Sequence, residues 1–455
     1  MRIRIPPLFR RQPTTPTDPN VSFVVKQAFA GDLGPFWTED TADWPIDYIS
    51  YTSESAFCEA LKAKATTDIV TIPNGIVAHT LTLQPFTKPA STGNEDRHTV
   101  QCWDLPSGQW TFVGVSDGVC DSSAPARYLY LTSPCDAGHS GHETSEYTVK
   151  LLPTVIRSHL ESTLGHDLEA TPGAVGDALS NAIQAFDKSL EDDLKAVIPE
   201  NFESLGDEEL QAVVNDQVTG GHVYTRVIRC MRGACSVIIV IDPSKENLWS
   251  VNLGDCEAVI GEKGLSGDHK VSILTSIHNA TIAAEKERIH ADHPGQEEAI
   301  LNNRVLGALE PTRAIGDHSF KLPAVYTEKI FLNAQPGFRV PRIARQVATR
   351  NKTPPYVSSV PEVQHRKLDK FATSKVIVAT DGLRDLYEGR LSATDDLIKR
   401  WVHVVMEEDD GFGGHKALSL ASDGLGDDLN TKSMRLTVDL DQAWLDDTTI
   451  VVMTI

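Results

Sequence analysis

Acidic residues stand at the ends of several apolar segments of this chain. Asp117 ends FVGVSD, Asp381 follows VIVAT, and Asp446 opens DDTTIVVM. A strand is rigid, so carboxylates at the ends of neighbouring strands can converge and bind a hard cation with little reorganisation. A single Asp-Gly after an apolar run is most often only a turn. With Asp255 and the run NEDR at 94–97 besides, the set favours a polynuclear metal site, although position alone leaves both interpretations open.

Strands and helices must position these acids. Short apolar runs predict buried strands at 112–115, 237–241, 376–379 and 450–453. Apolar residues recur at helical spacing between Val175 and Leu194, which predicts an amphipathic helix, and a further helix is predicted at about 145–160. No long sequence period repeats, which excludes solenoids and propellers. The sequence therefore predicts a mixed α/β domain.

Two stretches differ in composition from the rest. Residues 1–45 are rich in Pro, Thr and Asp without sustained periodicity, so we predict a leader or flexible arm there and a domain over 46–455. Residues 322–363 hold six prolines. They are predicted to form a long irregular insertion, which in compact domains is usually functional or mobile.

Composition limits the partners and the compartment. The formal charge of −21 would repel nucleic acid and anionic membrane surfaces. Seven scattered cysteines argue against a disulfide framework, and no apolar run is long enough to span a bilayer. We expect an intracellular protein. The first 17 residues carry four arginines and no acid, as mitochondrial presequences do, but also four prolines. The mitochondrial matrix and the cytoplasm both stay open.

An ordered series of motifs resembles that of the metal-dependent (type 2C) serine/threonine protein phosphatases. The motifs are NEDRH at 94–98, FVGVSDG at 112–118, VNLGDCEAV at 251–259, RVLGALEPTRAIGD at 304–317, VIVATDGLRDLYE at 376–388 and DDTTIVVM at 446–453. Each motif alone is weak, whereas the ordered set is specific. Residues 278–294 and 353–363 further resemble the pyruvate dehydrogenase phosphatase branch and its fungal relatives. The resemblance implies a sandwich of two antiparallel sheets flanked by helices, with a metal cleft at one edge.

The resemblance implies a metal-binding role for each matching acid. Asp117 would bridge two Mg²⁺ or Mn²⁺ ions, whose other protein ligands would be Glu95, the Gly118 carbonyl, Asp381 and Asp446. Asp96 would hold a metal-bound water, and Asp255 with Asp385 matches a weaker third-metal position. Two such ions activate water to attack phosphate, so no covalent phosphoenzyme and no catalytic cysteine are expected.

Some positions depart from the family pattern. Ser91 stands where many members carry an arginine that binds substrate phosphate, although the branch that this chain resembles tends to lack it. Cys256-Glu257 replaces a frequent Ser-Arg, and Arg384 replaces a usual tryptophan. Arg97 and Arg313 keep family positions, and for Arg313 we favour a structural ion pair.

The motif after Gly118 is interrupted. The family continues into His-x-Gly, which here resumes only at His139, the residue that the resemblance makes the general acid. Deleting residues 119–138 leaves FVGVSDGHSGHETSEYTV, and codons for both ends can supply the GT and AG of an intron. We therefore hypothesise that this aberrant insertion is a translated retained intron. A genuine surface loop is the rival hypothesis.

The leading hypothesis is a Mg²⁺- or Mn²⁺-dependent phosphatase of phosphoserine and phosphothreonine, with metal-activated water as the nucleophile. Its partner would be a phosphoprotein, and the branch resemblance makes the E1 subunit of pyruvate dehydrogenase the first to test. A second hypothesis, motivated by the broken motif and Ser91, is a catalytically weak or inactive binding protein with this fold. A hydrolase of small phosphate esters is disfavoured, because the chain has no glycine-rich phosphate loop of the G-x-x-x-x-G-K-[ST] type.

Overall fold

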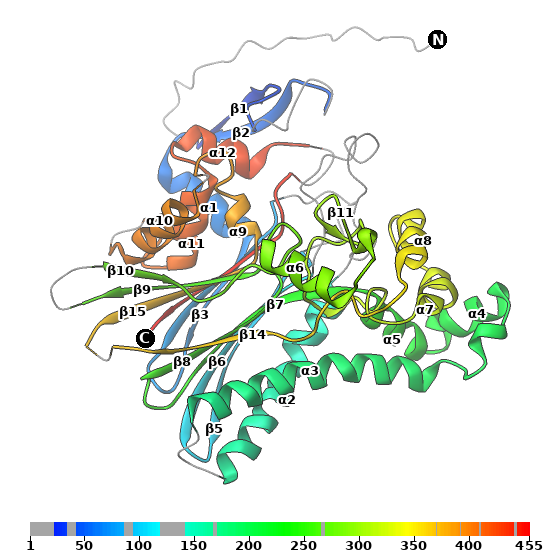
Figure 1. Ribbon diagram of the computed structural model, residues 1–455. Coiled ribbons are helices and arrows are strands. Elements are labelled where there is room, and N and C mark those ends of the chain that lie inside the picture. Colours follow the sequence, from blue (N-terminus) through cyan, green and yellow to red (C-terminus); the bar gives the residue numbers. More distant parts are fainter. Residues whose placement is uncertain are drawn as a thin grey trace, which may run out of the picture.

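Two antiparallel β-sheets lie face to face in the centre of the computed structural model (Figure 1). The structure describes residues 22–33, 42–85, 94–118, 142–166, 171–264, 269–369, 371–391, 393–408, 411–440 and 444–455. Within these ranges no helix is both long and apolar enough to cross a membrane. The two-sheet sandwich expected from the sequence is confirmed.

The sheets combine strands that are distant in the sequence. The first has the order β10 (His269–Ile273), β9 (Glu257–Lys263), β15 (Thr373–Ala379), β16 (Thr448–Thr454), β4 (Val77–Leu83), β3 (Ala65–Thr71). The second has the order β14 (Glu362–Lys367), β8 (Asn247–Leu253), β7 (Gly233–Ile241), β6 (Gly108–Asp117), β5 (Arg97–Leu105), and β13 (Ile315–Gly316) pairs with β7. All four strands predicted from apolar runs are present, as parts of β6, β7, β15 and β16.

Side chains of the central strands point alternately to the space between the sheets and to the outer helices. In β15, Val376 and Val378 pack between the sheets, whereas Ile377 and Ala379 face the helices outside. β7 follows the same rule, because its odd-numbered residues from Val237 to Ile241 pack between the sheets and its even-numbered ones do not. Successive side chains of a strand point to opposite faces. Strands buried on both faces therefore read as continuous apolar runs, which is why the sequence revealed them.

Helices cover the outer face of each sheet (Figure 1). The second sheet is covered by α2 (Glu143–His166) and α3 (Pro172–Val197), the two helices predicted from the sequence. The first sheet is covered by α1 (Glu54–Lys64), α10 (Thr394–Met406), α11 (Lys416–Leu425) and α12 (Leu429–Thr437). The short α9 (Gly382–Asp385) follows β15 directly.

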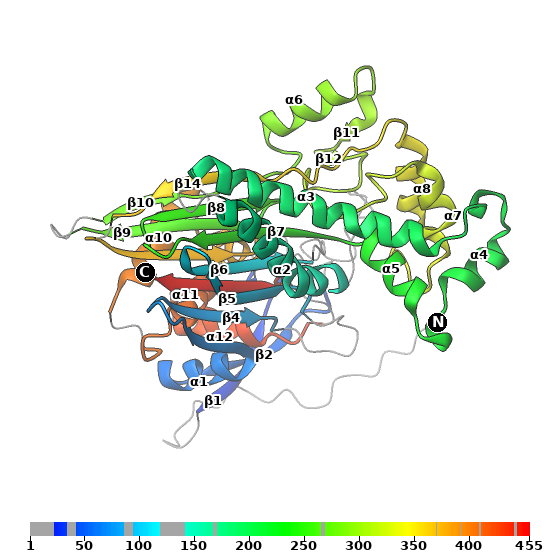
Figure 2. The same ribbon diagram turned by 90° about the horizontal axis from the view of Figure 1, so that it is seen from below.

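A further apolar core lies beyond one end of the sandwich (Figure 2). Its elements are η2 (Phe202–Ser204), α4 (Asp207–Val214), α5 (His222–Met231), α6 (Ala283–Asp292), η4 (Glu297–Ala299), β11 (Ile300–Leu301), β12 (Arg304–Val305), α7 (Ala324–Lys329), η5 (Phe331–Asn333) and α8 (Pro341–Arg350), whereas η3 (Gln217–Thr219) between α4 and α5 has no buried residue. Buried residues of α4, α5 and α8 contribute to this one cluster.

Two predicted stretches are more ordered than the sequence indicated. Residues 322–363 are not irregular throughout, because they contain α7, η5 and α8. Pro341 occupies the first turn of α8, where proline is tolerated because that backbone N–H has no helical partner. Within the predicted leader, β1 (Phe23–Ala28) pairs with β2 (Ile46–Tyr51), and Ala28 is fully buried. The insertion at 119–138 lies outside the described residues.

Candidate metal centre

Three aspartates at strand ends bring their carboxylates together. Asp117 is the last residue of β6, Asp255 follows β8, and Asp381 follows β15. One carboxylate oxygen from each lies within 4.8 Å of the other two. Because β6 and β8 belong to one sheet and β15 to the other, the cluster lies where the ends of both sheets meet.

Burial and mutual repulsion dominate the electrostatics of the cluster. Burial, followed by the charge of Asp381, raises the pKa of Asp117 well above its ordinary value. Burial, followed by the charge of Asp446, does the same to the pKa of Asp381. Burial also raises the pKa of Asp255, and it raises the pKa of Asp385 to about 7. Carboxylates held this close need a positive charge among them to stay ionised together.

The donor set fits divalent cations. The Oδ1 atoms of Asp255 and Asp96 are buried and have no hydrogen-bond partner within the part of the chain that the structure describes. Buried polar atoms are normally paired, so such atoms call for an ion or a water. Carboxylate oxygens are the ligands that Mg²⁺ and Mn²⁺ prefer. Asp117, Asp255 and Asp381 would therefore hold such an ion.

The loop at residues 94–96 is fixed against the end of β6. Asp447 accepts a hydrogen bond from the Glu95 N–H at 2.5 Å, and Ser145 Oγ donates to the Glu95 carbonyl at 2.5 Å. A Cβ on Gly118 would come within 2.8 Å of that carbonyl, so only glycine fits there. The Glu95 side chain is thereby held in the interior, 2% exposed.

Asp96 is held by a contact from the other sheet. Thr380 Oγ1, next to Asp381, donates to Asp96 Oδ2 at 2.8 Å. Burial, followed by the charge of Asp447, raises the pKa of Asp96 to about 7, and a hydrogen bond with Asp117 acts in the opposite direction. Asp96 therefore belongs to the same group of interacting carboxylates as Asp117.

The structure describes every acid of the predicted ligand set. Asp117, Asp255 and Asp381 share one cluster, and the charges of Asp96 and Asp446 act on Asp117. Asp385 acts on Asp381 in the same way. Which of these groups bind an ion stays a prediction. His139 and Ser91 lie outside the described residues.

Comparison with known proteins identifies the family. A family model described as "Protein phosphatase 2C" matches residues 136–407, more than half of the chain. The chain belongs to the protein phosphatase 2C family. The family predicted from the ordered motifs is thus confirmed.

Relatives within the protein phosphatase 2C family come from fungi and animals. A protein phosphatase 2C homolog of Schizosaccharomyces pombe is 25% identical over 305 residues, which cover 67% of this chain and 59% of the relative. The mitochondrial pyruvate dehydrogenase (acetyl-transferring) phosphatase 1 of Saccharomyces cerevisiae is 26% identical over 318 residues, 69% of this chain and 50% of the relative. The human mitochondrial phosphatase 2 of the same name is 31% identical over 208 residues, 44% of this chain and 36% of the relative. The chain thus matches between 36% and 59% of the length of these relatives.

Two departures from the protein phosphatase 2C pattern compensate each other. Glu257 begins β9 opposite Ala379, and Arg384 lies in α9 just after Asp381. The Arg384 Nε and Nη2 atoms donate to the two Glu257 carboxylate oxygens at 2.7 and 2.8 Å. Such a bidentate pair is the strong geometry for an arginine and a carboxylate. One ion pair therefore explains both unusual residues.

Some supporting residues were not singled out from the sequence. Asp447 holds the Glu95 backbone, Thr380 holds Asp96, and Cys235 forms a side-chain hydrogen bond with Asp255. The double Asp at 446–447 was the available signal for the first. For Thr380 and Cys235 nothing in the sequence separates them from ordinary strand residues.

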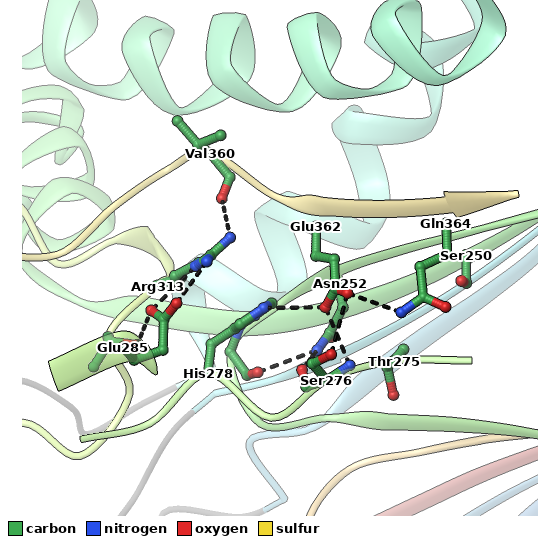
Figure 3. Close-up of polar contacts among 12 residues, drawn as sticks. Ser250, Asn252, Thr275, Ser276, His278, Glu285, Arg313, Val360, Glu362 and Gln364 are labelled. Carbon is green, nitrogen blue, oxygen red and sulfur yellow. Dashed lines mark hydrogen bonds and ion pairs between the residues drawn. The ribbon is translucent and has the colours of Figure 1, made fainter. Parts of the chain in front are cut away.

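Two further polar clusters anchor the segment between β10 and β14 (Figure 3). Glu362 accepts hydrogen bonds from Ser276 and lies 3.3 Å from His278 Nε2, and the His278 N–H donates to the Gly254 carbonyl. Arg313 pairs with Glu285 and donates to the Val360 carbonyl. The structural role favoured for Arg313 is confirmed by these contacts.

Glu285→Gln should remove a pH-dependent part of the stability. Burial alone would raise the pKa of Glu285, but hydrogen bonds from Arg313, Arg288 and Thr312 outweigh burial and lower it to about 2. A lowered folded-state pKa stabilises above the unfolded value of about 4.5 and loses this contribution as pH falls through 2. We expect the variant to lose about 2 kcal/mol at pH 7 and progressively less between pH 4.5 and 2.

Urea unfolding at several pH values measures this difference. The matched control is Glu287→Gln, an exposed glutamate two residues further along α6, which should change the free energy of unfolding by less than about 0.5 kcal/mol. A deficit of Glu285→Gln that is the same at pH 3 as at pH 7 would contradict the pKa assignment.

Proposed function

We propose that this chain hydrolyses phosphoserine and phosphothreonine esters of proteins with Mg²⁺ or Mn²⁺ as cofactor. The observation that carries the proposal is the convergence of Asp117, Asp255 and Asp381 within 4.8 Å. Two divalent ions bound in such a site lower the pKa of water and neutralise the charge of the phosphate. The remaining roles belong to residues of the chain.

We propose these roles from the family motifs together with the contacts above. Asp117 would bridge both ions, with Glu95 and the Gly118 carbonyl on one side and Asp381 and Asp446 on the other. Asp96, oriented by Thr380, would orient a water molecule. Asp255 and Asp385 would form a weaker third position. His139 would protonate the leaving oxygen, a task suited to the near-neutral pKa of imidazole.

Pyruvate dehydrogenase is the first substrate to test. Two of the relatives named above are pyruvate dehydrogenase phosphatases, and both names place those proteins in mitochondria. We therefore propose the phosphorylated E1 subunit as the substrate and the mitochondrial matrix as the compartment. A phosphopeptide from that subunit, compared with unrelated phosphoserine peptides, measures whether it is preferred.

The deciding experiment compares this chain with a version that lacks residues 119–138. Both are assayed for Mn²⁺-dependent hydrolysis of p-nitrophenyl phosphate and of a phosphoserine peptide, with and without chelator. We expect the shortened chain to turn over both substrates faster, because His139 then follows Gly118 directly.

Each outcome separates the hypotheses. Equal, chelator-sensitive turnover by both forms would mean that the insertion is a tolerated surface loop. Turnover by the shortened chain alone would support the retained-intron hypothesis. Absence of turnover in both forms would favour the second candidate, a phosphoprotein-binding protein with this fold. The interrupted motif at 119–138 is the observation that suggests this candidate. Turnover of small esters without any peptide activity would instead indicate a small-molecule phosphatase.

A further inference from the structure

An arginine from the segment before α8 reaches the acidic site. Arg339 lies between η5 and α8, in the stretch that the sequence predicted as an irregular insertion. Its Nη2 atom lies 3.4 Å from Glu95 Oε1, across a sequence separation of 244 residues. The Arg339 side chain is 43% exposed, whereas the Glu95 side chain is 2% exposed. The guanidinium therefore lies at the boundary between the buried loop and solvent.

The charge of Glu95 also acts on a second arginine. Arg232 follows α5 and is 7% exposed, and its Nη1 atom is paired with Glu143 at the start of α2. Its Nε is buried and, among the described residues, has no hydrogen-bond partner. Burial lowers the pKa of Arg232 to about 10, while the charge of Glu95 raises it and that of Arg339 lowers it. The two guanidinium groups and Glu95 thus lie within electrostatic reach of one another.

Elements from separate parts of the chain bring these groups together. Arg232 precedes β7, Arg339 precedes α8, and Glu95 precedes β5. α5, α7 and α8 lie at the same end of the sandwich in both views (Figure 1 and Figure 2). The buried residues Val227, Phe331 and Ile343 belong to the one core that joins α5 to the segment around Arg339. The arginine pair is therefore part of a packed structure.

Two arginines match the charge of a phosphate monoester. The chain carries a formal charge of −21 and would repel a dianion over most of its surface. Planar guanidinium groups bind phosphate through paired, charge-assisted hydrogen bonds. At the position that often supplies an arginine for this purpose, the chain has Ser91.

We propose that Arg339, supported by Arg232, forms the cationic subsite that binds the phosphate of the substrate. The inference rests on the proposed function, because it assigns the phosphate recognition of that same site. The Arg339 guanidinium lies at the solvent boundary beside Glu95, and the buried Arg232 adds positive charge within electrostatic reach. The competing role for Arg339 is a purely structural ion pair with Glu95.

Binding of inorganic phosphate tests the subsite without turnover. Isothermal titration calorimetry in the presence of Mg²⁺ compares the full chain with Arg339→Ala, Arg339→Lys and the control Arg342→Ala, an exposed arginine in the first turn of α8. We expect Arg339→Ala to weaken phosphate binding about tenfold, the equivalent of one charge-assisted hydrogen bond. Arg339→Lys should recover part of the affinity because it keeps the charge, and Arg342→Ala should change it less than about twofold.

A structural role would give a different pattern. Under that role Arg339→Ala would lower the melting temperature and leave the phosphate dissociation constant unchanged, which would overturn the proposal. Absence of phosphate binding by the unmodified chain would overturn it as well. Unchanged melting with weakened phosphate binding is the expected result.

Kinetic measurements distinguish a failure of the subsite proposal from a failure of the proposed function. In the active form of the chain, Arg339→Ala should raise KM for a phosphoserine peptide and the inhibition constant of phosphate together, with a smaller change in kcat. If the chain is active but Arg339→Ala leaves the inhibition constant of phosphate unchanged, the subsite proposal is wrong and the phosphatase proposal stands. If the chain binds phosphate through Arg339 but shows no turnover, the phosphatase proposal is wrong and the subsite proposal stands.

Discussion

Asp117→Asn should lower kcat/KM for Mg²⁺-dependent hydrolysis of a phosphoserine peptide by at least about 100-fold, because even residues that only support metal ligands often contribute 10- to 100-fold. Asp117 stands at the centre of the cluster, since the charges of Asp381, Asp96, Asp446 and Asp255 all act on it. The charges of Asp446, Asp255, Asp385 and Asp96 act on Asp381 in the same way. Asparagine keeps the shape and removes the charge that an ion would need.

The same variant should be more stable than the unmodified chain when metal is removed. Burial and neighbouring carboxylates raise the pKa of Asp117 in the folded state, so this group lowers the free energy of unfolding at pH 7. The cost disappears below the ordinary pKa of 3.8, where the folded and unfolded states are both protonated. In chelator at pH 7 we expect Asp117→Asn to gain about 1 kcal/mol, a common cost of keeping a functional site strained. Urea unfolding measures it.

Metal then reverses the order of stability. Mg²⁺ stabilises the folded state in proportion to its affinity, so it should raise the melting temperature of the unmodified chain and much less that of Asp117→Asn. The control is Asp395→Asn, an exposed aspartate in the first turn of α10. It should leave activity and metal response unchanged. Near-normal turnover by Asp117→Asn, or an equal response of both proteins to Mg²⁺, would contradict the placement of the metals at Asp117.

The acids at strand ends could be predicted because two local signals coincide. Val376 to Ala379 form a continuous apolar run, which is typical of a strand buried on both faces, and Asp381 follows after Thr380. The helix from Val175 to Leu194 was predictable for a similar reason, because its apolar residues recur at helical spacing and are buried, those up to Leu190 in the core of the second sheet and Leu194 in the further core. Where local pattern and tertiary position agree, one sequence is enough.

Other elements have no such local signal. β1 exposes most of its side chains, so its only evidence is the pairing with β2. α7 and α8 lie among prolines that read as loop, although Pro341 begins a helix whose buried face includes Ile343 and Val347. Contacts between residues that are distant in the sequence cannot be predicted from the sequence either. Nothing near Arg339 indicates that it meets Glu95, and nothing near Glu257 indicates Arg384.

The ion pair between Glu257 and Arg384 is expected to make a large contribution to stability. Arg384→Ala should lower the free energy of unfolding by about 3 kcal/mol, because it leaves Glu257, whose side chain is 5% exposed, without its ionic partner. The arginine side chain is 29% exposed, so the lost packing of its stem adds to the effect. Removing one partner of a buried ion pair lowers the free energy of unfolding by more than the pair contributes to it. The Glu257 charge is then left without compensation near Asp255 and Asp381.

A double-mutant cycle isolates the interaction. Glu257→Ala together with Arg384→Ala should be more stable than Arg384→Ala alone, with a coupling of about 2 kcal/mol. The surface control is Lys188→Ala, whose partner Asp192 lies on the exposed face of α3, and it should cost less than about 0.5 kcal/mol. Additive single effects would contradict an energetic coupling between Glu257 and Arg384.

The family-like exchange completes the argument for compensation. Glu257→Arg alone would place two guanidinium groups side by side, and Arg384→Trp alone would strand Glu257, so each should destabilise the chain. Together they restore the residue types that the motif usually carries, and we expect the double variant to recover most of the loss. If the double variant is no more stable than the worse of the two single variants, the pair is not interchangeable with the family arrangement. The positions of Asp381 and Asp385 in this chain would then depend on the Glu257–Arg384 ion pair itself.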